Sequence, residues 1–138
     1  MQRSVLFLLI FVLSPWSAAE TATGRVFVDE NRNGQLDDGE VGLAKVRVSN
    51  GTNVVLTDED GRYRIAVDER TIIFITKPSN YAIPVNQHML PQFYYIHQPD
   101  GSPAGMRYAG IEPTGPLPEQ INFPLVERPE EKKFEAIL

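Results

Sequence analysis

The 138-residue sequence contains no cysteine, only two histidines and, after its first 19 residues, no long apolar run. Without cysteine the chain has no disulfide to stabilise its fold. A two-metal catalytic centre needs several histidine and aspartate ligands, and His88 and His97 are too few to supply them. No later apolar stretch approaches the roughly 20 residues that a membrane-spanning helix requires. The sequence also lacks a G-x-S-x-G elbow, a phosphate-binding glycine loop and an H-E-x-x-H helix.

Positive charge is scarce as well. The chain has 13 lysines and arginines against 18 acidic residues, which gives a formal net charge of −5. This balance argues against a nucleic-acid partner, and it leaves no polybasic patch for a membrane surface. The length suits one domain with a single modest core.

The N-terminus has the composition of a secretory signal peptide. Met-Gln-Arg precedes an apolar stretch over 4–13, and small residues follow up to Ala19. This order predicts cleavage after Ala19 and export to the periplasm or the medium, with no membrane attachment afterwards. An exported domain without disulfides needs another means of stabilisation, and a bound metal ion is one such means.

Residues 29–40 read D-E-N-R-N-G-Q-L-D-D-G-E and have the pattern of a calcium-binding loop. Calcium takes six to eight oxygen ligands, which alternate acidic and amide residues can supply from one turn. The predicted ligands are Asp29, Asn31, Asn33, the carbonyl of Gln35, Asp37 and Glu40. Gly34 lies where such a loop must turn sharply. The alternative is a surface hairpin without metal, because Asn-Gly and Asp-Gly are also turn sequences.

The segments flanking this loop indicate a structural ion. Residues 24–28 and 41–48 are β-branched or alternating, so the loop joins strands and not the helices of a calcium sensor. Asp58 and Asp60 follow a predicted strand. They either add ligands from a neighbouring loop or only stabilise their own turn.

Alternation and turn residues predict an all-β chain. The expected strands are 24–28, 43–48, 53–57, 62–67, 71–76, 93–97 and 121–125. Their spacing indicates a β-sandwich, with a proline- and aromatic-rich loop region over 78–120. The continuous apolar run 71–76 predicts a strand buried on both faces. Pro124 predicts that its strand lies at a sheet edge.

The expected domain boundaries follow from these patterns. Residues 20–126 form the sandwich, and 127–138 form a charged linker and the start of a second domain. Phe134–Leu138 is apolar and ends abruptly, which suggests a chain cut at the first strand of that domain.

Several motifs carry a resemblance to known families. The strings G-R-V-F-V-D-E-N-R-N-G-Q-L-D-D-G-E, V-V-L-T-D-E-D-G-R-Y, F-Y-Y-I-H-Q-P-D-G-S-P and P-T-G-P-L-P-E-Q-I-N-F-P-L resemble the N-terminal domain of secreted calcineurin-like metallophosphoesterases. The first half is also similar to the calcium-binding B repeats of bacterial surface adhesins. Both resemblances imply a transthyretin-like (prealbumin-like, Ig-like) β-sandwich, with T-D-x-x-G-x-Y at Thr57–Tyr63 as a shared signature. The motifs of the second half favour the phosphoesterases.

The resemblance implies a domain without catalytic residues of its own, whose partner is its own C-terminal phosphoesterase domain. That domain would follow Leu138 and would hold the catalytic divalent metals, while calcium in this chain would be structural. His97 either contacts the partner domain or the reaction, or is an ordinary hydrogen-bonded histidine. The alternative function is an adhesin-like stalk or ligand-binding module that meets a cell-surface ligand and has no phosphatase attached.

Overall fold

The computed structural model describes residues 20–103, 105 and 110–128, and this part of the chain consists of strands and loops without a helix. The predicted signal peptide 1–19, most of the predicted linker and the expected strand 134–138 lie outside the described residues. The strands are β1 (Glu20–Val28), β2 (Arg47–Ser49), β3 (Val54–Leu56), β4 (Arg62–Val67), β5 (Thr71–Thr76), β6 (Tyr81–Ala82), β7 (Tyr94–His97) and β8 (Phe123–Glu127). No described segment is a helix long and apolar enough to cross a membrane.

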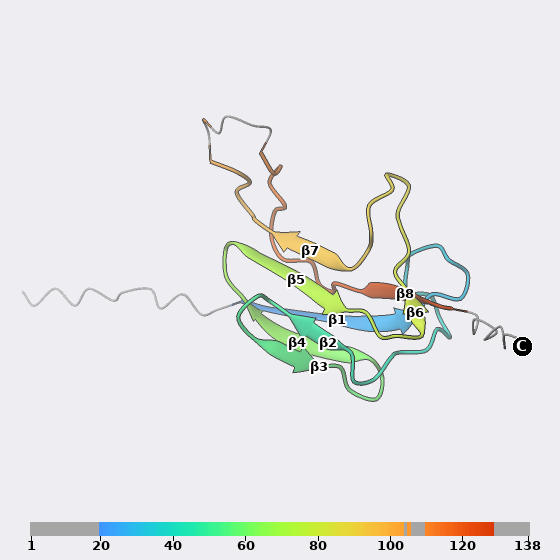
Figure 1. The fold of residues 1–138 in the computed structure, drawn as a ribbon. Coiled ribbons are helices and arrows are strands. Elements are labelled where there is room, and N and C mark those ends of the chain that lie inside the picture. The colour runs from blue at the N-terminus through green and yellow to red at the C-terminus, as the bar shows by residue number, and fades with distance from the viewer. Residues whose placement is uncertain (1–19, 104, 106–109, 129–138) are drawn as a thin grey trace, which may run out of the picture.

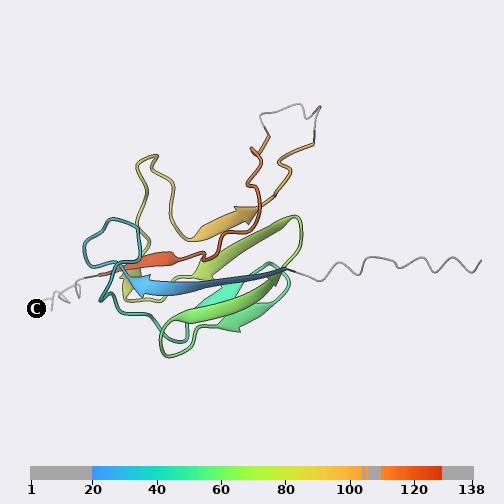
Figure 2. The same ribbon diagram turned by 180° about the vertical axis from the view of Figure 1, so that it is seen from behind.

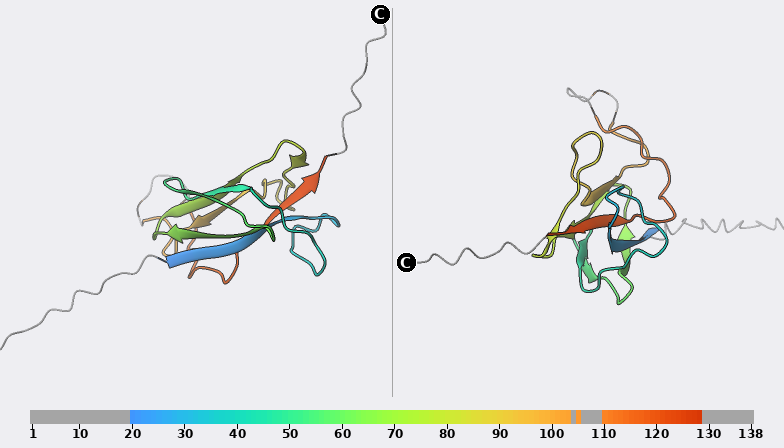
Figure 3. Two further views of the ribbon diagram at one scale, coloured as in Figure 1. Left: turned by 90° about the horizontal axis from the view of Figure 1, so that it is seen from below. Right: turned by 90° about the vertical axis from the view of Figure 1, so that its right-hand side faces the viewer.

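The strands form two four-stranded sheets packed as a sandwich (Figure 1). One sheet has the order β4-β1-β8-β6 and the other the order β3-β2-β5-β7. Only β1 and β8 pair in parallel, and the remaining pairs are antiparallel. Figure 2 shows the same arrangement from behind, and the views in Figure 3 show the sheets stacked face to face. The predicted all-β sandwich is confirmed.

The core lies between the sheets and follows the alternation of the strands. In β4 every second residue is buried, beginning with Tyr63, and in β5 Ile73 and Ile75 point inward. The buried cluster comprises Ala22, Val26, Val46, Val48, Tyr63, Ile65, Val67, Ile73, Ile75, Ile121, Phe123 and Leu125. Burial of this apolar surface is the main stabilising contribution for a chain without disulfides.

The chain segment that enters β8 packs closely on the first sheet. A Cβ added at Gly24 would lie 1.8 Å from the carbonyl oxygen of Ile121, so no larger residue fits there. The Tyr63 hydroxyl donates a hydrogen bond of 2.7 Å to the same carbonyl. The Tyr63 ring stacks on Phe123 with ring centroids 6.0 Å apart. Burial raises the pKa of Tyr63 above its ordinary value.

The predicted strand 43–48 is mostly wrong, because regular pairing begins only at Arg47. The Leu43 N–H donates to the Val26 carbonyl of β1, whereas the Lys45 N–H donates to the Thr57 carbonyl beside the second sheet. Residues 43–46 therefore pass from one sheet to the other. Lys45 has a φ of 60°, which lies outside the strand region and interrupts the extended chain.

The run 71–76 forms β5 with the predicted bounds, but only one of its faces is buried. Ile72 is 51% exposed and Phe74 is half-buried, whereas Ile73 is fully buried. The predicted burial on both faces is wrong for the described chain, because nothing in it covers the outer face of the second sheet.

The predicted edge position of Pro124 is also wrong. β8 lies between β1 and β6, and Pro124 is opposite Phe27 of β1. β6 pairs with β8 only at Val126 and Glu127, so Pro124 faces no strand on that side. Proline has no N–H to donate, and this is tolerated at Pro124 because, as at a sheet edge, no strand lies on that side.

Candidate metal site and neighbouring surfaces

The loop after β1 is folded around the carboxylate of Asp29. This residue is 1% exposed, and its N–H donates to the Leu125 carbonyl at 2.9 Å. Its two carboxylate oxygens accept hydrogen bonds from the N–H groups of Asn33 (3.1 Å) and Gly34 (2.8 Å). Gly34 has a φ of 76°, a conformation that favours glycine. The first predicted ligand thus sets the path of the loop.

Glu40 closes the same loop from its other end. It is 9% exposed. One carboxylate oxygen accepts from the Glu30 N–H at 3.2 Å, and the other accepts from the Asp37 N–H at 2.9 Å. Among the described residues neither Asp29 nor Glu40 forms an ion pair with a basic side chain. Buried charges in proteins are normally paired or coordinate a metal, so two unpaired carboxylates form the most conspicuous feature of this loop.

The amides of Asn31 and Asn33 meet the carboxylate of Asp37. Both side-chain NH₂ groups donate to the same Asp37 oxygen at 2.7 Å. Their amide oxygens accept from the N–H groups of Asn33 (3.0 Å) and Gln35 (2.7 Å). All four of these residues are exposed. In this arrangement the amide nitrogens of Asn31 and Asn33, and not their oxygens, contact the Asp37 carboxylate.

Within the described ranges, no three histidine, cysteine, aspartate or glutamate side chains come together as a metal-binding group. The predicted ligands do share one hydrogen-bonded loop, but three of its members contribute amide or carbonyl oxygens. The donor set is composed entirely of oxygen, which suits a hard cation such as calcium. The calcium site stays a prediction.

The two additional candidate ligands lie in the turn between β3 and β4. One Asp58 oxygen accepts from the N–H groups of Asp60 (3.0 Å) and Arg62 (2.8 Å). The Asp60 carboxylate forms an ion pair with Arg62. Both carboxylates therefore have partners within their own turn.

The two histidines lie on separate segments. His97 ends β7 and is 2% exposed, with its Nε2 at 3.5 Å from a Glu20 carboxylate oxygen. Its Nδ1 is buried and has no hydrogen-bond partner among the described residues. His88 is exposed, and its Nε2 lies 3.2 Å from the Gln87 side-chain nitrogen.

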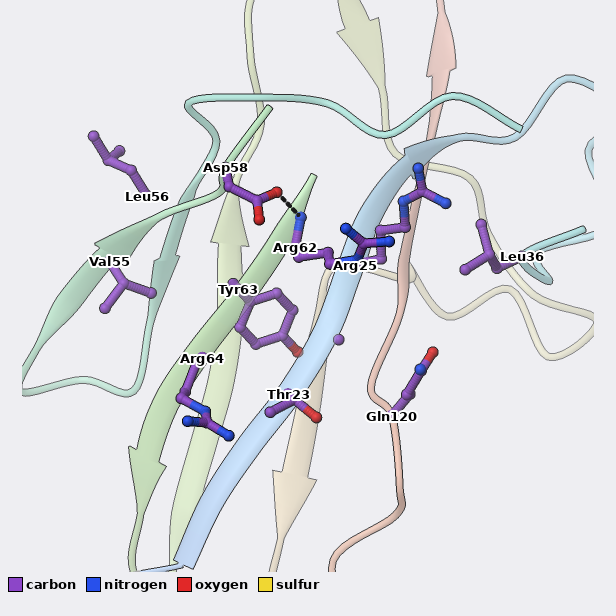
Figure 4. Close-up of a pocket in the computed structure, with 11 residues that line it drawn as sticks. Thr23, Arg25, Leu36, Val55, Leu56, Asp58, Arg62, Tyr63, Arg64 and Gln120 are labelled. Carbon is purple, nitrogen blue, oxygen red and sulfur yellow. Dashed lines mark hydrogen bonds between the residues drawn. The ribbon is translucent and has the colours of Figure 1, made fainter. Parts of the chain in front are cut away.

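Sequence analysis missed a hollow of about 520 Å³ that is lined by three arginines (Figure 4). Arg62 and Arg64 come from β4 and Arg25 from β1. The spacing R-x-R in a predicted strand places two arginines on one face. Arg25 could be added only after the pairing of β1 with β4 was known.

A second missed feature is the apolar outer face of the sheet β3-β2-β5-β7. Val54 is 60%, Leu56 is 58% and Ile72 is 51% exposed. Strand pairing places one row of residues side by side across the sheet: Val54, Ser49, Phe74 and Tyr94. It also places Ile72 beside Ile96. The apolar residues of this outer face are Val54, Leu56, Ile72, Phe74, Tyr94 and Ile96, and we call them the outer apolar face. The polar residues Arg47, Ser49 and Thr76 lie on the same side of the sheet, between those of β3 and those of β7.

Comparison with known proteins identifies the family. The family model MetallophosN, described as "N terminal of Calcineurin-like phosphoesterase", matches residues 30–110. The matched range begins within the predicted calcium loop and continues through β7. No curated protein sequence matches the chain. Because the match covers more than half of the sequence and agrees with the resemblance of its motifs, the chain belongs to the family of N-terminal domains of calcineurin-like phosphoesterases.

Proposed function

We propose that this chain is the non-catalytic N-terminal domain of an exported calcineurin-like metallophosphoesterase, and that it packs against the catalytic domain and positions it. The family match supports an N-terminal place in such a protein. The observation that carries the packing role is the outer apolar face. A sandwich needs only one buried face on each sheet. Apolar residues on the outer face of a sheet therefore indicate that another protein surface packs against them.

The composition of this face fits a domain interface. Ile72, Phe74 and Tyr94 lie on the neighbouring strands β5 and β7, and the exposed Val54 and Leu56 extend the face to the edge strand β3. Neighbouring apolar residues on the outer side of a sheet, as on β5 and β7, are typical of interaction sites. Covering it contributes roughly 25 cal/mol per Å² of apolar area.

We also propose that the loop 29–40 holds one structural Ca²⁺. The ligands would be Asp29, Asn31, Asn33, Gln35, Asp37 and Glu40. The ion would supply the positive charge that the buried carboxylates of Asp29 and Glu40 lack. Residues 1–19 have the composition of an export signal, so we place this function in the periplasm or outside the cell.

The packing role can be tested in the longer protein that joins this chain to a phosphoesterase domain. Ile72→Lys places a charge in the outer apolar face. Val85→Lys is a matched control, because Val85 is also 51% exposed and lies outside that face, in the segment between β6 and β7. Loss of an interface anchor of about 1.4 kcal/mol corresponds to a tenfold change in domain association. We expect Ile72→Lys to speed proteolysis at 127–133 about tenfold, and Val85→Lys to leave it unchanged.

Neither substitution should lower the melting temperature of the 138-residue chain alone, since both side chains are exposed there. Equal proteolysis of the two variants would contradict the packing role. A reading frame with no phosphoesterase after Leu138 would remove the catalytic partner and favour the adhesin-like module.

A further inference from the structure

A second hollow lies at the end of the sandwich where β8 ends, beside the loop 29–40. Figure 1 shows the end of β8 and this loop at the same end of the molecule. The hollow has a volume of about 430 Å³. Its apolar lining is formed by Val28, Val41, Leu43, Tyr81 and Val126. We call it the end hollow.

Paired main chain forms the walls of the end hollow on both sides of β1. On one side the Val28 N–H donates to the Val41 carbonyl at 2.8 Å. On the other side Val28 lies beside Leu125 of β8, and Tyr81 of β6 lies opposite Glu127 of β8. The hollow is therefore bounded by hydrogen-bonded segments whose positions the sheet determines.

The described chain covers the apolar lining of the end hollow only in part. Val41 is 59% exposed, and Val28 and Val126 are half-buried. Leu43 and Tyr81 pack against the core and are also half-buried. The hydrophobic effect favours the removal of such surface from water. The lining is thus suited to receive one further apolar side chain.

The rim of the end hollow carries more negative than positive charge. Glu30 and Glu127 contribute exposed carboxylates, and Arg32 contributes an exposed guanidinium. The buried carboxylate of Asp29 also lines the hollow. A group that fits here should therefore combine an apolar side chain with neighbouring positive charge.

The sequence supplies such a combination shortly after β8. Residues 129–138 lie outside the described part of the chain and read P-E-E-K-K-F-E-A-I-L, so two lysines directly precede Phe134. β8 ends at Glu127, which itself lines the end hollow. Phe134 follows Arg128 by six residues, which an extended chain spans in about 20 Å. This reach includes the neighbouring hollow.

We propose that Phe134 occupies the end hollow, with Lys132 and Lys133 beside the rim carboxylates of Glu30 and Glu127. The phenyl ring would cover the apolar lining, and the lysines would offset the negative charge of the rim. This contact would fix the segment that leads from the sandwich to the phosphoesterase domain. The inference thus deepens the proposed packing role and rests on it for its purpose.

The test is limited trypsin digestion of the 138-residue chain, which contains no phosphoesterase domain. Trypsin cleaves after Lys132 and Lys133, and mass spectrometry measures the release of the residues that follow. Cleavage of a segment that opens and closes rapidly follows the population of its open form. We expect Phe134→Ser to speed this cleavage about tenfold, which corresponds to about 1.4 kcal/mol. Leu138→Ser, which changes another apolar residue of the same segment, should leave the rate unchanged.

A second pair of substitutions tests the hollow itself. Val41→Lys places a positive charge among the apolar side chains and close to the two lysines. Val54→Lys is the matched control, because Val54 is 60% exposed and lies in β3 of the other sheet. Cleavage after Lys132 and Lys133 should be about tenfold faster in Val41→Lys and unchanged in Val54→Lys. Cleavage within 20–128 should stay as in the wild type, which checks that the fold is intact.

Equal cleavage rates in the wild type and Phe134→Ser would overturn the proposal, and so would equal rates in Val41→Lys and Val54→Lys. Protection that is lost on dilution would also overturn it, because the hollow would then hold a segment of a second copy. Ile72→Lys, which tests the packing role, should leave these rates unchanged in the chain alone. Failure of the packing role is seen only in the longer protein, so the two proposals can fail separately.

Discussion

Calcium should raise the melting temperature of this domain, and Glu40 should be required for most of the rise. The carboxylates of Asp29 and Glu40 are buried without a basic partner in the described chain. Asp37 adds a third negative charge to the same loop, although its carboxylate accepts hydrogen bonds from the amides of Asn31 and Asn33, and like charges within one loop repel each other. A cation that binds only the folded chain offsets this repulsion and stabilises the fold by mass action.

The size of the effect follows from linkage. An ion present at a hundred times its dissociation constant adds about 2.7 kcal/mol to the free energy of unfolding. For a domain of about 100 residues, each kcal/mol moves the melting temperature by about 4–8 °C. Saturating calcium should therefore raise it by about 10–20 °C relative to a chelator-treated sample. Magnesium should do much less, because it demands a small octahedral site and keeps its water.

Glu40→Gln tests the loop with little change of shape. It removes the negative charge that holds the ion and one of the two oxygens that accept loop N–H groups. Most of the calcium-dependent rise should be lost. Asp38→Asn is the control, since Asp38 is an exposed carboxylate of the same loop and is not a predicted ligand. Thermal unfolding followed by calorimetry in calcium and in chelator measures both. If the wild-type curves coincide in the two buffers, the loop is a metal-free turn and the calcium proposal is refuted.

Three other predictions test the fold and the function. Gly24→Ala should destabilise the chain by about 3 kcal/mol, the upper end of overpacking costs, because its Cβ would meet the Ile121 carbonyl. Gly39 has a φ of 95°, and a Cβ added there would meet no other atom. Gly39→Ala should therefore destabilise the chain by only about 1 kcal/mol, through backbone strain, and denaturant unfolding measures both variants. Tyr63→Phe should cost about 1 kcal/mol through its lost hydrogen bond. Burial raises the pKa of Tyr63 in the folded state, so the unfolded chain loses its proton first and stability falls as the pH rises above about 10. The decrease in stability at high pH should be smaller in Tyr63→Phe. An unchanged dependence of stability on pH would contradict the assignment of this effect to Tyr63. The chain alone should not hydrolyse nitrophenyl phosphates with added Mn²⁺ or Zn²⁺. Metal-dependent turnover that disappears in His97→Ala would overturn this expectation.

Local patterns were readable from the sequence by itself. Alternation predicted β4, and a continuous apolar run predicted β5, both with their observed bounds. These features depend on side-chain period and on turn chemistry, which a few neighbouring residues determine. The candidate ligands of the calcium loop could likewise be chosen from sequence spacing alone. The structure adds that Asp29 and Glu40 are the buried members of that set.

Other features depend on contacts between distant segments, which no local pattern encodes. Pro124 lies inside a sheet because β6 is too short to reach it. Residues 43–46 leave the strand conformation because the chain changes sheets there. The outer face of β5 is open because no described segment packs on it, although its apolar run alone suggests burial. The arginine hollow exists only because β1 pairs with β4 in a register that places Arg25 opposite Arg62. Composition and period determined which elements form, and the pairing of strands far apart in the chain decided which side chains meet.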